Sequence, residues 1–89
     1  MSNSKEFLTA VEYVNRLKTR PNDDELLSLY GLYKQSTVGD VNTERPGLLN
    51  IKGRSKWDAW SSRSGMTTNQ AETQYVVTVN NLIKQYGCN

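Results

Sequence analysis

The architecture of this chain is most constrained by residues 30–35, Tyr30-Gly31-Leu32-Tyr33-Lys34-Gln35. On a helix, this segment places two phenol rings and one ammonium within about one turn of each other. A second segment, Lys56-Trp57-Asp58-Ala59-Trp60, also combines a lysine with large aromatic rings. Positive charge suits a phosphate, and aromatic surface with hydroxyl groups suits a base or a sugar. The two segments therefore predict a site for a flat anionic ligand.

Apolar periodicity and helix-breaking residues divide the chain into four segments that we expect to be helical. Two of them begin with a capping-box pattern, Asn22 with Glu25 and Thr67 with Gln70. Residues 75–79 favour a strand on β-propensity alone, but the wider period of their segment favours a helix. The expected helices cover residues 5–18, 23–38, 55–63 and 67–86. Together they predict an all-α four-helix bundle, with residues 1–89 as one domain.

A long loop is expected between the second and third helices. Residues 39–53 show no helical period and contain Pro46 and Gly47. Loops of this length in small domains are uncommon unless they have a function. We expect Leu48, Leu49 and Ile51 to pack the loop against the body of the protein.

Composition limits the classes of function. The chain has 89 residues, a net charge of +2 and a mean hydropathy of -0.69. The near balance of charge argues against a general nucleic-acid binder, which would carry a larger basic excess. Cys88 is the single cysteine, so an intramolecular disulfide and a cysteine metal cage are both excluded. With no signal-like apolar core and no membrane-spanning run, we expect a cytoplasmic protein.

The sequence offers little for catalysis. It has no histidine, which excludes histidine triads and the usual zinc sites, and it has no glycine-rich phosphate loop. Asp23, Asp24 and Glu25 are adjacent acids, but a capping role at the start of a helix explains all three. We therefore expect no catalytic residues and no bound metal.

The aromatic residues allow two interpretations. By periodicity alone, such rings are more often core residues than ligand contacts. Against this, Lys34 lies one turn after Tyr30, and Lys56 precedes Trp57. A fully buried lysine is costly, so these faces should border solvent. The residues concerned are Tyr30, Tyr33, Trp57, Trp60 and Tyr75.

Three segments resemble the signature of the acyl-CoA-binding protein family. They are Tyr30-Gly31-Leu32-Tyr33-Lys34-Gln35-Ser36-Thr37-Val38-Gly39-Asp40, Asn42-Thr43-Glu44-Arg45-Pro46-Gly47 and Lys56-Trp57-Asp58-Ala59-Trp60. Apolar residues elsewhere also match the spacing of the family, so the resemblance spans nearly the whole chain. It implies a bundle of four helices that binds one long-chain acyl-CoA thioester and performs no chemistry on it.

The resemblance also implies roles for individual residues in binding the coenzyme A head group. Contacts with the ribose 3'-phosphate are implied for Tyr30, Lys34 and Lys56. Contacts with adenine and ribose are implied for Tyr33 and Tyr75. Weaker contacts are implied for Trp57 and Asn15, and Asn15 stands where the family often has a lysine. Trp60 is expected to be packed in the protein.

The implied function is non-enzymatic binding, buffering and intracellular transport of long-chain acyl-CoA esters. The acyl-CoA is then a ligand, no cofactor is needed, and a monomer with transient contacts to acyl-CoA-using enzymes is expected. Nucleic-acid binding and stable membrane insertion are not expected. Two alternatives remain at this stage. One is an interaction module for an acidic protein, and the other is a thioester hydrolase using Ser36 or Ser55.

Overall fold

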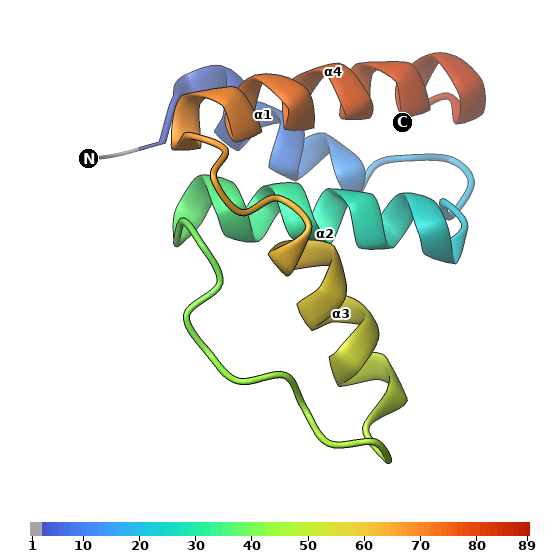
Figure 1. The fold of residues 1–89 in the computed structure, drawn as a ribbon. Helices are drawn as coiled ribbons and strands as arrows, with labels where there is room; N and C mark the ends of the chain where they lie inside the picture. Colours follow the sequence, from blue (N-terminus) through green and yellow to red (C-terminus); the bar gives the residue numbers. More distant parts are fainter. Residues whose placement is uncertain (1–2) are drawn as a thin grey trace.

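The computed structural model describes residues 3–89, and four helices account for most of them (Figure 1). The helices are α1 (Lys5–Val14), α2 (Asp23–Thr37), α3 (Ile51–Ser61) and α4 (Thr68–Tyr86). Helix α2 packs against α4 and α3, while α1 packs against α4. The molecule is flat, with extents of 38 × 31 × 15 Å. The prediction of an all-α fold is confirmed.

The hydrophobic core joins α1, α2 and α4. Each helix contributes at least two buried side chains from its apolar stripe. Burying a side chain of this size stabilises the fold by about 1.5–3 kcal/mol. The core residues are Phe7, Ala10, Leu29, Leu32, Tyr75, Val79 and Leu82. None of them comes from α3, so this helix depends on other contacts to hold its position.

Helix α3 is held on α2 by a close backbone approach at Gly31. A Cβ atom at Gly31 would overlap the carbonyl group of Ala59, so only glycine permits this distance between the helices. Beside this contact, buried Trp60 donates its indole N–H to the carbonyl oxygen of Gly39 at 2.7 Å. The position of α3 is therefore set by one glycine and by one anchored tryptophan.

Both expected capping boxes are confirmed. In α2, the Asn22 side chain accepts from the Glu25 N–H at 2.8 Å, and the Glu25 carboxylate accepts from the Asn22 N–H at 2.9 Å. Thr67 and Gln70 form the same pair of bonds at the start of α4. Glu25 also accepts from the hydroxyl of Tyr86 at 2.7 Å, which ties the end of α4 to the start of α2.

Helix α1 ends at Val14, so the expected extension to residue 18 is wrong. Beyond the helix, Leu17 forms an antiparallel bridge with Cys88. The Lys18 N–H donates to the Gly87 carbonyl at 3.0 Å, and the Asn89 N–H donates to the Arg16 carbonyl at 2.8 Å. The C-terminal segment thus takes up backbone groups that a longer helix would use itself.

Helix α3 begins at Ile51, so the expected start at residue 55 is also wrong. The Asn50 side chain caps this helix by accepting from the Gly53 N–H at 2.9 Å. A Cβ atom at residue 53 would overlap that capping side chain. Gly53 therefore lies inside the first turn and makes room for the cap, and it does not break the helix. The helix also ends at Ser61, before the expected residue 63.

The long loop before α3 is fixed by polar contacts. Trp57 donates its indole N–H to the Thr43 carbonyl at 2.9 Å, and Arg45 forms two bonds with the Asp58 carboxylate at 2.9 and 2.8 Å. The expected anchors Leu48, Leu49 and Ile51 are exposed, so that expectation is wrong.

Replacing Gly31 by alanine should destabilise the protein, because the new methyl group would push α3 away from α2. We expect a loss of about 1–3 kcal/mol in the free energy of unfolding, measured by urea titration. Gly47→Ala is the matched control, since a Cβ at residue 47 meets nothing within 4 Å. Equal stability of the two variants would contradict the close contact.

Candidate functional site

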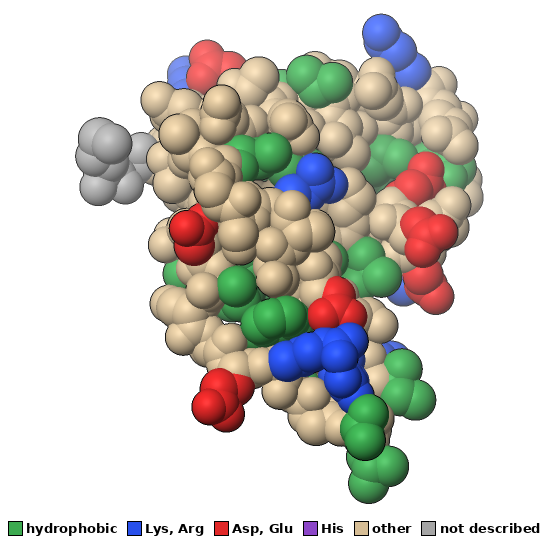
Figure 2. Space-filling model, in the orientation of Figure 1, with side chains coloured by type: hydrophobic (Ala, Val, Ile, Leu, Met, Phe, Trp, Pro, Cys, Tyr) green, Lys and Arg blue, Asp and Glu red, His purple; other side chains and the backbone are tan. Residues whose placement is uncertain are grey.

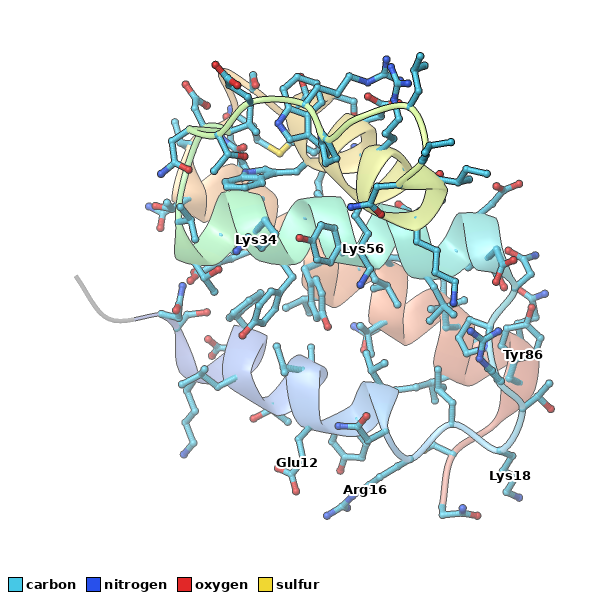
Figure 3. All side chains as sticks on the ribbon, turned by 90° about the horizontal axis from the view of Figure 1, so that it is seen from below. Glu12, Arg16, Lys18, Lys34, Lys56 and Tyr86 are labelled. Carbon is cyan, nitrogen blue, oxygen red and sulfur yellow. The ribbon has the colours of Figure 1, made fainter. Side chains whose placement is uncertain are left out.

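The structure brings the predicted head-group residues together around α2. In Figure 3, Lys34 and Lys56 are both seen along this helix, between α1 on one side and α3 on the other. Tyr30, Tyr33 and Lys34 share α2, Lys56 comes from α3, and Tyr75 comes from α4. We call the surface formed by Tyr30, Tyr33, Lys34 and Lys56 the cation–aromatic face.

Each lysine of this face rests on an aromatic ring. The Lys56 ammonium lies 5.5 Å from the ring centroid of Tyr30, and the Lys34 ammonium lies 4.8 Å from that of Trp60. Such contacts hold the charge in place and leave N–H groups free to donate. Among residues 3–89, neither lysine takes part in an ion pair. Two positioned ammonium groups are therefore available to an anion.

The remaining rings form a cluster between α1, α2 and α4. The ring centroid of Phe7 lies 6.1 Å from Tyr33 and 5.0 Å from Tyr75, and those two tyrosines lie 6.4 Å apart. Tyr33 is 39% exposed and Tyr75 only 4%. Burial, with a smaller effect from Tyr33, raises the pKa of Tyr75 to about 12. Tyr33 thus offers its ring to a ligand, while Tyr75 supports it as a neutral phenol.

Both interpretations of the aromatic residues hold, each for different rings. Tyr75 is buried in the core and Trp60 is buried between α3 and α2, whereas Tyr30 and Trp57 are half-buried and Tyr33 is exposed. The sequence missed the part played by Trp60 beneath the Lys34 ammonium. A lysine and a tryptophan on different helices share no period, so only the packing of α3 on α2 brings them together.

A polar hub around the buried Gln35 side chain holds the end of α2. Gln35 donates its side-chain amide to the Asp40 carboxylate at 2.8 Å and to the Met66 carbonyl at 2.7 Å. Asp40 also accepts from the Gly65 N–H at 2.8 Å. The hydrogen bond from Gln35, followed by that from Gly65, lowers the pKa of Asp40. This hub lies next to Gly39, whose carbonyl anchors the Trp60 indole.

The two weaker predicted contacts have structural roles. Asn15 is exposed as the C-cap of α1, and Trp57 holds the loop through its bond to the Thr43 carbonyl. Next to Asn15, Arg16 is paired with Glu12 at 2.9 Å. Figure 3 shows this pair beyond α1, away from Lys34 and Lys56. Arg16 therefore does not replace the cation that the family often has at position 15.

An open groove runs between α2 and α3 and meets the cation–aromatic face at its Tyr30 end. Its volume is about 470 Å³, and its apolar side chains are Leu26, Leu27 and Ile51. The sequence missed the lining residues Ile51 and Lys52, because the expected start of α3 lay too late in the chain. On the correct helix, Lys52 and Lys56 are four residues apart and share one face. The full lining is Arg20, Asp23, Leu26, Leu27, Tyr30, Ile51, Lys52, Ser55 and Lys56.

Other chemistry has little support in the geometry. Ser36 is buried and donates its hydroxyl to the Leu32 carbonyl at 2.7 Å, which ties up the nucleophile considered for a hydrolase. Within residues 3–89 there is no group of three or more His, Cys, Asp or Glu residues placed to hold a metal. No helix in the same range has the length and apolar character needed to cross a bilayer.

An all-α fold with two ring-supported cations near a groove with apolar side chains is the arrangement expected of a binding protein for an amphipathic anion. Residues 4–79 match the profile of the family described as Acyl CoA binding protein. The chain belongs to the acyl-CoA-binding protein family.

Individual relatives agree with this assignment. The chain is 51% identical over 87 residues to a putative acyl-CoA-binding protein from a species of Hypsibius, covering 98% of both sequences. It is similar to the crystal structure of Oryza sativa Acyl-CoA-Binding Protein 2, with a TM-score of 0.87 and 41% identity over 91% of this chain and 88% of the other. It is also similar to the crystal structure of ACBP from Moniliophthora perniciosa, with a TM-score of 0.86 and 38% identity over 96% and 86%.

The raised pKa of Tyr75 predicts late ionisation of its phenol. Because the folded state favours the neutral form, the contribution of Tyr75 to stability is complete below about pH 10 and declines as the pH rises toward 12. NMR titration of labelled tyrosine rings should show this delay, with Tyr75→Phe identifying the signal. Ionisation of Tyr75 at or below its ordinary pKa of 10.0 would contradict its burial.

Proposed function

We propose that this protein binds long-chain acyl-CoA esters and acts as their intracellular buffer and carrier, without reacting with the thioester. The observation that carries this proposal is the pair of ring-supported ammonium groups, Lys34 and Lys56, of which Lys56 also lines the groove between α2 and α3. Membership of the acyl-CoA-binding protein family supports the ligand class. The proposal places the protein inside the cell as a monomer, because Lys34, Lys56 and the groove all belong to one chain.

The head group binds at the cation–aromatic face. The ribose 3'-phosphate lies between Lys34 and Lys56 and accepts from their ammonium groups and from the Tyr30 hydroxyl. Charge-assisted hydrogen bonds of this kind contribute about 1.5–3 kcal/mol each. The adenine lies against the exposed ring of Tyr33, which Phe7 and Tyr75 hold from behind. Ring surface around the phosphate lowers the local polarity and strengthens its bonds.

The acyl chain lies in the groove between α2 and α3. Burying each methylene contributes about 0.8 kcal/mol, so a dozen sheltered carbons contribute roughly 10 kcal/mol before ordering costs. An open groove is therefore sufficient for the chain, provided that the head group fixes its position. Leu26, Leu27 and Ile51 supply the apolar surface.

Replacing either lysine should weaken binding of palmitoyl-CoA by about tenfold or more, because a charge-assisted bond to the phosphate is lost. Isothermal titration calorimetry of Lys34→Ala and Lys56→Ala measures this loss. Lys84→Ala, which removes an exposed charge from the last turn of α4, is the matched control. The losses should nearly vanish for palmitoyl-dephospho-CoA, which lacks the 3'-phosphate. Absence of micromolar binding by the unmodified protein would refute the proposed function.

The groove predicts a separate effect of Leu27. Leu27→Ser should weaken palmitoyl-CoA binding by about tenfold, since apolar contact with the chain is lost, and should leave free coenzyme A binding unchanged. Val77→Ser on α4 is the control for removing an exposed apolar residue. Equal losses for palmitoyl-CoA and free coenzyme A would place the chain outside this groove.

A further inference from the structure

Three large apolar side chains project from the protein where the long loop joins α3. Leu48 is 80% exposed, Leu49 is 98% exposed and Ile51 is 74% exposed. We call these three residues the leucine tip. Figure 2 shows hydrophobic side chains gathered at the lowest point of the molecule, which is the junction of the loop with α3 in Figure 1. Contiguous exposed apolar side chains of this size commonly mark an interaction site.

The leucine tip is accompanied by positive charge. Lys52 follows it directly, and Lys56 lies one turn further along α3. Neither forms an ion pair with a residue in the described range 3–89. The nearby acids Asp23 and Asp58 are paired with arginines at 3.6 and 2.8 Å, and Glu44 is an exposed acid of the loop. The first two turns of α3 therefore present ammonium groups without a paired acid, next to exposed leucines.

We propose that the leucine tip docks reversibly on bilayers that contain anionic phospholipid. Leu48 and Leu49 enter the interfacial region, while Lys52 and Lys56 remain at the level of the head groups. The shape favours lipid over protein as the occupant. Three projecting side chains cover far less than the roughly 800 Å² per partner that stable protein interfaces bury. A bilayer deforms around such a projection and needs no complementary pocket.

The leucine tip lies next to the groove, so docking of the tip also brings the groove to the bilayer. Ile51 belongs both to the leucine tip and to the lining of the groove between α2 and α3. When the tip is docked, the open groove adjoins the apolar part of the bilayer. An amphipathic chain then passes between lipid and groove with little exposure to water. This inference extends the proposed function, but the docking itself does not depend on it.

Sedimentation with lipid vesicles tests the docking. The protein is mixed with phosphatidylcholine vesicles, with or without phosphatidylserine, at low and high salt. We expect binding to the vesicles with phosphatidylserine, weaker binding at high salt, and a loss of at least about tenfold for the Leu48→Ser/Leu49→Ser double variant. The matched control is Leu8→Ser/Val77→Ser, which removes two exposed apolar residues from α1 and α4. Lys52→Glu should weaken binding by about fivefold or more.

Three results would overturn the proposal. They are failure of the unmodified protein to bind, equal binding of the double variant and its control, and equal binding to both kinds of vesicle. Self-association without vesicles that the double variant abolishes would assign the tip to a second copy of the chain, and would also overturn it. Palmitoyl-CoA binding is measured separately without vesicles. Because Leu48 and Leu49 lie outside the groove lining, the double variant should retain it, which separates failure of docking from failure of the proposed function.

Discussion

The close contact of α2 and α3 at Gly31 is the constraint on which the candidate site depends. Helix α3 contributes nothing to the core formed by the other three helices, so its position is set by backbone approach and by the burial of Trp60. This approach places Lys56 over the ring of Tyr30 and places Trp60 beneath Lys34. A shift of α3 would separate both cations from their rings at the same time.

The same contact creates the groove. One side of α3 faces Leu26 and Leu27 of α2, and Lys56 lines the groove where it meets the cation–aromatic face. Positive charge and apolar surface thus lie close together on the same two helices. This arrangement suits a ligand with an anionic head and a long apolar tail. In the proposed binding mode, a small, flat protein needs no enclosed cavity, because the head group would fix the ligand and the tail would need only a surface.

Local patterns predicted the helices well where local interactions decide them. The capping boxes at Asn22 and Thr67 lie where their sequence signature places them, and residues 75–79 are helical because their period outweighs their β-propensity. The errors arose from contacts between distant residues or from an ambiguous glycine. The bridge between Leu17 and Cys88 ends α1 early, which no local pattern reveals. The expected loop ran to Gly53, although this glycine lies in the first turn of α3 and makes room for its cap.

The candidate site was also predicted only in part from the sequence. Periodicity placed Tyr30 and Lys34 on one side of α2, and the cost of burying lysine placed both lysines near solvent. The roles in binding a 3'-phosphate and an adenine came from the resemblance to a family and remain proposals. The pairing of Lys34 with Trp60 could not be predicted, because it depends on how α3 crosses α2. The exposure of Leu48 and Leu49 was missed because apolar loop residues usually pack inward.

The most direct test of the head-group assignment is a crystal structure of the protein with palmitoyl-CoA. It should show the 3'-phosphate within hydrogen-bonding distance of the Lys34 and Lys56 ammonium groups and the Tyr30 hydroxyl, with the adenine against Tyr33. The acyl chain should follow the groove between α2 and α3. A coenzyme A head group bound elsewhere, such as in the surface groove between α1 and α4, would contradict the central role of the cation–aromatic face.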